Sequence, residues 1–385
     1  MSRKVCVVIT ARPSYARIKT ALHAIRDHED LELQLVVGAS ALLERYGSAI
    51  DTIEDDGFDV AARVFMVVEG ENLVTSAKST GLGLVELATV FDNLRPDLVV
   101  TIADRYETIA TAIAAAYNNI PLAHIQGGEI SGSIDEKVRH AITKLADIHL
   151  VATERSRENV IRMGEDPETV HFVGGPDIDL AAQLSNDAAL DFDPFDRFGG
   201  VGERFSLDDG FIIVLQHPVT TEYAEAQGQV LETLHAVNSI GIPTLWFWPN
   251  VDAGSDGTSK GIRTFRELEK PQRIHFFRNM PPEEFLRVVV GSRAVVGNSS
   301  VAIRECSFLG IPAVNVGDRQ AGREHGQNLT HVGYDRAEIT AAILAQLEVG
   351  RYPSDPVYGD GRSGARIADV LARTPLRIAK RLTYG

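Results

Sequence analysis

The stretch DLVVTIADRYETIATAIAAAYNNIPLAHIQ, residues 97–126, joins two short apolar runs through an alanine-rich segment. The runs have the length and β-branched content of buried strands, and residues 107–118 between them have the length and composition of a helix. A strand, a helix and a strand in this order form a parallel pair, because only a long crossover returns the chain in the same direction. The stretch therefore predicts a parallel α/β sheet.

The same alternation extends in both directions from this stretch. Toward the N-terminus lie KVCVVIT, a helix from about Tyr15, LELQLVV and a helix over about 73–94. A second series of strands runs through FIIVLQH, IPTLWFW, IHFFRN, AVVGNSS and IPAVNVG, and the polar segment 187–209 between the two series is expected to be a linker.

Two such series predict an α/β protein of two Rossmann-like domains, residues 1–180 and 205–361, whose parallel sheets face a central cleft. The remaining residues, 362–385, form a C-terminal segment. Its helix, over about 362–381, is expected to pack back on the first domain.

Composition limits the classes of function. The 385 residues carry 53 acidic and 38 basic side chains, a net charge of -15, which argues against a nucleic-acid partner. No segment approaches the roughly 20 apolar residues of a membrane-spanning helix, so we expect a cytoplasmic protein without a membrane partner. Two cysteines, Cys6 and Cys306, lie in predicted core elements and indicate no disulfide. No dinucleotide fingerprint, phosphate loop or metal-binding motif is present, so we predict no cofactor and no metal.

In parallel sheets ligands bind beyond the carboxyl ends of the strands, and polar residues follow nearly every predicted strand. Asp104 is a strong candidate, because a carboxylate at a buried strand end must be paired or face a polar site. His217 could equally be a structural imidazole, and Ser299 with Ser300 could cap a helix or bind phosphate there. A solvated loop is the alternative for Arg319 and Arg323.

Several ordered motifs carry a resemblance to a known family. They are ITARPSYARIK, ADRYET, AHIQGGEISGSIDEKVRHAITKLADIHLVATERSRENVIRMGE, QHP and GNSSVAIRECSFLGIPAVNVGDRQAGR. In these motifs, over nearly its whole length, the chain resembles the hydrolysing UDP-N-acetylglucosamine 2-epimerases, which open sialic acid and legionaminic acid biosynthesis in bacteria. The resemblance implies the glycosyltransferase-B fold, a nucleotide-sugar substrate, UDP as product, and a homodimer or homotetramer.

The resemblance also implies a mechanism and a set of site residues. The family eliminates UDP across C1 and C2 of the sugar to give a glycal, and then adds water to give N-acetylmannosamine. Carboxylates must move the C2 proton, and fixed donors must hold the departing diphosphate. The implied catalytic residues are Asp104, Gln126, Glu129, Asp135 and His217. The implied substrate-binding residues are Arg12, Tyr15, Arg139, Arg278, Ser299, Ser300, Glu305, Arg319 and Arg323. Glu305 is expected one and a half turns inside a helix, within reach of a ribose diol.

Gln126 departs from the family pattern, because the best-known members read HIEGGE where this chain reads HIQGGE. Glutamine cannot exchange a proton. Either Asp104, Glu129 or Asp135 carries both proton transfers while Gln126 orients the acetamido group or water, or the outcome differs. The different outcomes are hydrolysis without inversion at C2, another sugar, or binding without catalysis. The neighbouring Gly127 and Gly128 are expected to let the backbone approach the ligand closely.

Two enzyme classes of the same fold are the nearest alternatives. Non-hydrolysing 2-epimerases typically read HVEAGLR followed by PEExNR, whereas this chain reads GGEISGSIDEKVRH, which favours the hydrolysing branch. A glycosyltransferase would need an acceptor surface, and the first domain shows no basic amphipathic helix for a membrane surface. The nucleotide base, the sugar, the pathway and the division of acid and base roles stay open.

Overall fold

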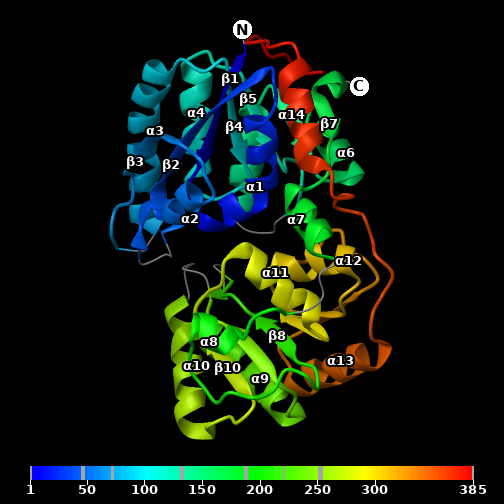
Figure 1. Cartoon of the computed structure of the whole chain (residues 1–385). Helices are drawn as coiled ribbons and strands as arrows, with labels where there is room; N and C mark the ends of the chain where they lie inside the picture. Colours follow the sequence, from blue (N-terminus) through cyan, green and yellow to red (C-terminus); the bar gives the residue numbers. More distant parts are fainter. Residues whose placement is uncertain are drawn as a thin grey trace. The chain divides into compact units, whose positions relative to one another are not determined.

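The computed structural model describes residues 2–44, 48–70, 73–130, 134–185, 190–219, 222–249 and 255–383. The chain divides into two compact units (Figure 1). The first comprises residues 1–130, 134–179 and 358–385, and the second consists mainly of residues 180–357. No helix within the described ranges is both long and apolar enough to cross a membrane.

The first unit is built on a parallel sheet with seven strands in its described part. In order across the sheet these are β3 (Val60–Val64), β2 (Leu31–Gly38), β1 (Arg3–Ile9), β4 (Leu98–Ile102), β5 (Leu122–Ile125), β6 (Ile148–Val151) and β7 (Val170–Phe172). All neighbouring strands are parallel, and Val5 of β1 lies opposite both Leu33 of β2 and Leu98 of β4. The strand, helix and strand predicted within residues 97–126 are confirmed as β4, α4 (Thr108–Tyr117) and β5.

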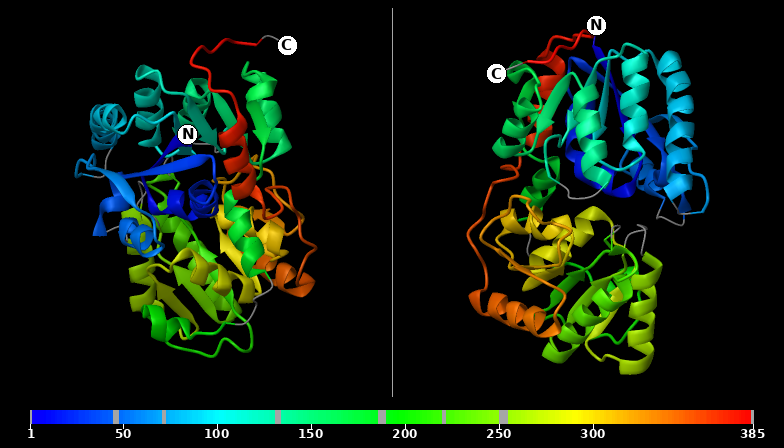
Figure 2. Two further views of the ribbon diagram at one scale, coloured as in Figure 1. Left: turned by 45° about the horizontal axis from the view of Figure 1, so that its top comes forward. Right: turned by 180° about the vertical axis from the view of Figure 1, so that it is seen from behind.

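Helices cover both faces of this sheet, because successive side chains of a buried strand point to opposite sides. Val5 and Val7 pack toward α1 (Arg12–Arg26) and α14 (Ser363–Arg373), whereas Cys6 and Val8 pack toward α3 (Leu73–Leu94), α4 and α5 (Ile134–Leu145). Figure 1 and the right-hand view of Figure 2 show these two faces. Helices α2 (Ala49–Asp55) and α6 (Glu154–Arg162) also belong to this unit, and α7 (Pro176–Leu184) begins in it and ends in the second.

Two helices differ from the predicted boundaries. Helix α1 begins at Arg12 rather than near Tyr15, since Pro13 fits the first turn of a helix. Helix α14 ends at Arg373 rather than near residue 381, because the residue before Pro375 is disfavoured in helical geometry. Helix α14 packs on α1, where a Cβ added to Gly364 would lie 2.8 Å from backbone atoms of Thr20.

The second unit has a parallel sheet with six strands in its described part. In order these are β10 (Ile274–Phe277), β9 (Thr244–Phe247), β8 (Ile212–Leu215), β11 (Ala294–Gly297), β12 (Ala313–Val316) and β13 (Leu329–Val332). Its helices are α8 (Pro194–Phe198), α9 (Ala226–Ile240), α10 (Ser255–Glu269), α11 (Pro282–Gly291), α12 (Glu305–Leu309) and α13 (Arg336–Val349). Ile212 and Val214 pack into the core on one face of the sheet, and Ile213 and Leu215 into the core on the other.

The segment expected to be a linker is a packed part of this unit wherever it is described. Residues 190–209 contain α8, whose Phe195 is 4 % exposed and stacks on Phe277. Val201 pairs with Phe276 of β10. The linker expectation is wrong here, because apolar side chains at 192, 195 and 198 give the segment its own buried face. Residues 187–189 of the same stretch lie outside the described residues.

Candidate active site

Arg139 of α5 connects three polar groups at the carboxyl edge of the first sheet. It is 2 % exposed, and its Nη2 donates to Oδ2 of Asp104, which follows β4. Its Nη1 donates to the main-chain oxygen of Gln126 after β5, at 2.5 Å, and lies 3.9 Å from Oε2 of Glu129. A buried guanidinium requires such acceptors, and its planar fork suits several at once. The structure thus brings together four residues that were predicted separately.

Asp135 lies on the same side of α5 as Arg139. It occupies the second position of the helix and is half-buried. Residues four apart in a helix share a face, so Asp135 lies one turn from Arg139 along α5. Residues 131–133, which precede the helix, lie outside the described residues.

His124 holds the backbone that carries Asp104. Its Nε2 lies 2.9 Å from the main-chain oxygen of Ala103, and its Nδ1 lies 3.1 Å from Oγ1 of Thr143. Because a carbonyl can only accept, Nε2 carries the proton. Burial lowers the pKa of His124 to about 3, so the imidazole stays neutral at physiological pH. Ala103 and Gln126 have φ values of 63° and 62°, which few non-glycine residues adopt, and this hydrogen bond supports the first of them.

The Gln126 side chain is fully buried and faces a second carboxylate. Its Nε2 donates to Oδ1 of Asp177 at 3.1 Å, and Asp177 is 4 % exposed at the second position of α7. Asp177 was not predicted from the sequence, because β7, the strand before it, has only three residues. The glycines at 174 and 175 followed by Pro176 are the signal that could have revealed this strand end.

Gly127 and Gly128 lie where packing within the protein requires glycine. Both are buried, and a Cβ added to Gly127 would lie 2.9 Å from Nδ1 of His124. A Cβ on Gly128, whose φ is 76°, would collide with the main-chain oxygen of Ser156 in α6. The pair therefore lets the loop after β5 pack against β5 itself and α6.

Arg12 and Tyr15 have different surroundings although both lie in the first turn of α1. Arg12 follows β1, the neighbour of β4, and burial lowers its pKa to about 10, so it remains charged at neutral pH. Tyr15 is 1 % exposed in the core, and its hydroxyl donates to Asp56. Tyr15 thus joins α1 to the end of α2.

In the second unit, Asn298 joins the ends of three strands. The main-chain nitrogen of His217, after β8, donates to Oδ1 of Asn298, and Nδ2 of Asn298 donates back to the oxygen of His217, both at 2.8 Å. Arg319, after β12, donates through Nη1 to the main-chain oxygen of Asn298 at 3.1 Å, and Gln320 donates to the same oxygen at 2.8 Å. His217 and Arg319 therefore lie at one edge of the second sheet.

The segment after β11 differs from its prediction. Ser299 caps a single 3-10 turn, Ser300–Ala302, by accepting a hydrogen bond from Val301. Glu305 then opens the separate helix α12, so it is not one and a half turns inside a helix. The break falls at Arg304, whose ψ of -79° lies outside the usual helical range. Arg323 donates to Gln320 at 3.0 Å, and Arg278, after β10, is exposed.

The model of the family described as UDP-N-acetylglucosamine 2-epimerase matches residues 23–372. The chain belongs to this family. It is 31% identical to the UDP-N,N'-diacetylbacillosamine 2-epimerase (hydrolyzing) of Legionella pneumophila, over 98% of this chain and 97% of that one. It is 30% identical to the UDP-N-acetylglucosamine 2-epimerase of Neisseria meningitidis, over 96% of this chain and 95% of the relative. The predicted resemblance is confirmed.

Solved structures of the UDP-N-acetylglucosamine 2-epimerase family share the fold of this chain. The Neisseria meningitidis enzyme bound to UDP-GlcNAc has a TM-score of 0.79 at 16% identity, with 96% of this chain and 100% of that chain covered. The Methanocaldococcus jannaschii enzyme in complex with UDP-GlcNAc and UDP has a TM-score of 0.79 at 17% identity, with the same coverage. The predicted fold of two parallel α/β domains is confirmed.

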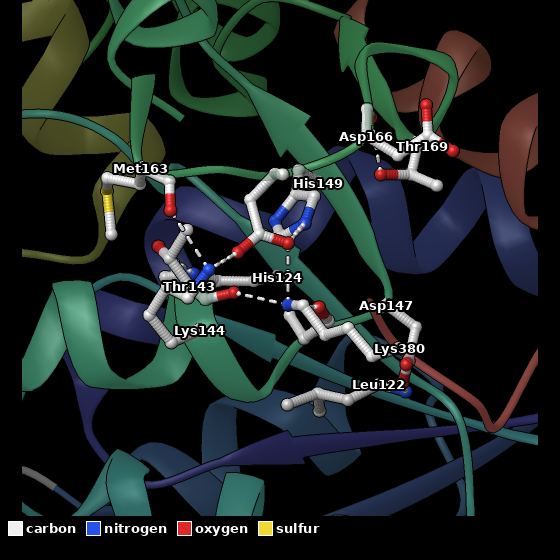
Figure 3. A network of polar contacts seen from close by, with 12 residues as sticks. Leu122, His124, Thr143, Lys144, Asp147, His149, Met163, Asp166, Thr169 and Lys380 are labelled. Atoms are coloured by element: carbon white, nitrogen blue, oxygen red, sulfur yellow. Dashed lines mark hydrogen bonds and ion pairs between the residues drawn. The ribbon is translucent and has the colours of Figure 1, made fainter. Parts of the chain in front are cut away.

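In this member of the 2-epimerase family, a buried charge network fixes α5 to the sheet (Figure 3). Glu165 is 2 % exposed and accepts from Lys144 of α5, from Lys380 at 2.6 Å and from His149 of β6 at 3.0 Å. Burial acts to raise the pKa of Glu165, but the three hydrogen bonds outweigh it and lower the pKa to about 2. Lys380 also donates to main-chain oxygens of Thr143 and Ala146, so the C-terminal segment helps to hold the helix that carries Asp135 and Arg139. Across the described ranges, no group of three or more His, Cys, Asp or Glu side chains could hold a metal ion.

Proposed function

We propose that this protein is a hydrolysing nucleotide-sugar 2-epimerase. It converts UDP-N-acetylglucosamine, or a related nucleotide 2-acetamido sugar, and water to UDP and N-acetylmannosamine or the related sugar. The observation that carries the proposal is the buried Arg139, which holds Asp104 and Glu129 at the carboxyl edge of the first sheet in a chain of the epimerase family. The hydrolysing reaction named for the Legionella pneumophila relative supports the same branch.

The first unit supplies the groups for proton transfer. Asp104, Glu129 and Asp135 are the carboxylates placed to move protons at C2, and Arg139 fixes the orientation of the first two. An arginine side chain stays protonated at neutral pH, so it can orient these carboxylates without exchanging a proton with the substrate. The amide of Gln126 cannot act as a general acid or base at neutral pH. Its role is therefore to orient the substrate or the side chains beside it.

The second unit supplies most of the groups suited to the nucleotide. His217 and Arg319 lie together around Asn298, and Ser299 and Ser300 follow β11. Together with Glu305, Arg323 and Arg278 of the same unit, they offer the cations and hydroxyls that a diphosphate and a ribose require. The relatives solved with UDP-GlcNAc and UDP support a nucleotide sugar as the ligand.

UDP-N,N'-diacetylbacillosamine is a second candidate substrate. The relative from Legionella pneumophila is named for that sugar, while the one from Neisseria meningitidis is named for N-acetylglucosamine, at nearly equal identity.

We further propose that the protein works as a homodimer or homotetramer in the cytoplasm. Three exposed aliphatic side chains, Val74, Leu82 and Val85, lie along one side of α3 in the first unit. Exposed apolar side chains on one helix face are typical of contacts between protein chains. Mass photometry at nanomolar concentration should show a species of two or four chains, and a monomer at all concentrations would contradict this.

Product analysis tests the proposed reaction. The purified protein is incubated with UDP-N-acetylglucosamine or UDP-N,N'-diacetylbacillosamine, and the products are followed by proton NMR. Free 2-epimerised sugar with UDP is the expected result. A UDP-linked epimer would indicate the non-hydrolysing reaction, free sugar without epimerisation a simple hydrolase, and binding without turnover a non-catalytic protein.

A further inference from the structure

Gln126 has one buried amide atom that the described part of the protein does not satisfy. Its nitrogen donates to Oδ1 of Asp177, so the amide oxygen points elsewhere. That oxygen, Oε1, is buried and has no hydrogen-bond partner among the described residues. Leaving a buried acceptor unsatisfied costs about 1–3 kcal/mol. The unpaired oxygen beside Asp177 therefore indicates a ligand that donates a hydrogen bond at this point.

The loop after β7 makes room for the Asp177 carboxylate. A Cβ on Gly175 would collide with Oδ1 of Asp177, so the side chain folds back over a position where only glycine fits. Asp179, two residues later, has a different and structural role. It accepts from the main-chain nitrogens of Ser363 and Gly364, at 2.8 and 2.6 Å, and so joins α7 to α14. Two acidic residues in one helical turn therefore face different partners.

The proposed reaction needs two groups that exchange protons. In the elimination a carboxylate takes the C2 proton, the C–H electron pair forms the C1=C2 bond, and the C1–O electron pair leaves with UDP. In the hydration a carboxylic acid gives a proton to C2, water bonds to C1, and the proton that this water loses restores the acid. Inversion at C2 requires that the two protons pass on opposite faces of the sugar, so a second group must act on the face away from the first.

We propose that Asp177 is a further catalytic residue, which exchanges one of these two protons, and that Gln126 positions it. This inference rests on the proposed function. The Gln126 amide cannot itself take part, but it holds a buried carboxylate at 3.1 Å and offers Oε1 to a substrate N–H, such as that of the acetamido group. Asp104 and Glu129 both lie beside the Arg139 guanidinium. Asp177 is a further carboxylate near these residues, and it lies beside the Gln126 side chain.

Three variants test the assignment, with kcat, KM, UDP affinity and melting temperature measured for each. Asp177→Asn should lower kcat about 10²–10⁴-fold, the usual contribution of a general acid or base, with UDP affinity unchanged within twofold. The double variant Q126E/D177N exchanges carboxylate and amide across the same hydrogen bond and should recover at least tenfold over Asp177→Asn. Asp179→Asn is the matched control in the same turn. It should lower the melting temperature and keep kcat of the folded protein within about fivefold.

Two results would overturn the assignment: a kcat of Asp177→Asn within threefold of wild type, or a double variant no more active than Asp177→Asn with UDP binding intact. If Asp177→Asn does not fold, Gln126→Glu alone provides the test. Two carboxylates in contact share a proton, so the acidic limb of its kcat/KM profile should rise by at least one pH unit, and an unchanged profile would exclude Asp177. No turnover by the wild-type protein would instead refute the proposed function, which distinguishes the two failures.

Discussion

Arg139 is the residue on which the geometry of the candidate active site depends most. It combines one ion pair to Asp104, one hydrogen bond to the backbone at Gln126 and a longer contact to Glu129. A lysine has a single nitrogen on a flexible stem and cannot reproduce this planar arrangement. The orientation of two carboxylates therefore depends on one side chain that need not touch the substrate.

Arg139→Lys should reduce kcat about 10²-fold, because a shift of about 1 Å in a catalytic group has an effect of this size. Steady-state kinetics on the nucleotide sugar, with a urea titration to verify folding, measure the change. Arg155→Lys, at an exposed position of α6, is the control and should behave as wild type. Activity of Arg139→Lys within threefold of wild type would show that the orientation of Asp104 does not depend on the guanidinium.

Helix α14 stabilises the first unit, although it lies far along the chain from the strands that it covers. Gly364→Ala should destabilise the protein by about 1–3 kcal/mol, because its Cβ would lie 2.8 Å from the backbone of α1 and force the two helices apart. Gly81→Ala in α3, where nothing lies within 4 Å of the added Cβ, should instead stabilise by up to about 1 kcal/mol. Urea unfolding measures both, and equal effects would contradict close packing of α14 on α1.

The elements that could be predicted are those buried on both sides. β1, β4, β5 and β8 are continuous apolar runs, and the sequence predicts them and the polar groups that follow. The edge strands β3, β7 and β13 are short or mix polar with apolar residues, so they escape detection. Asp177 was missed together with β7. Pairs such as Asp104 with Arg139 join residues 35 positions apart, and only the folded sheet edge reveals them.

At the scale of the whole molecule, the Glu165 network makes stability depend on pH. The folded pKa of Glu165 is about 2, below the usual value near 4.5, so its contribution is complete above pH 4.5 and is lost as the pH falls toward 2. Glu165→Gln should cost about 3–5 kcal/mol at pH 7 by leaving Lys380 and Lys144 without their shared carboxylate. The difference in free energy of unfolding between wild type and Glu165→Gln should become smaller as the pH falls from 4.5 to 2.

Urea titrations at several pH values test this, with Glu168→Gln on the exposed surface as control. If the difference in free energy of unfolding stays constant from pH 7 to pH 3, the ionised carboxylate of Glu165 does not stabilise the folded protein. His149 adds to the same trend, because burial lowers its pKa and its protonation in the unfolded chain favours unfolding below about pH 6.5.

We expect this protein to exchange the proton at C2 of a nucleotide sugar although residue 126 is glutamine. The most direct measurement is a proton NMR time course with UDP-N-acetylglucosamine in D2O, which observes UDP release and the C2 position of the sugar together. Free N-acetylmannosamine with deuterium at C2 is the expected product. Free N-acetylglucosamine that retains its C2 proton would contradict it.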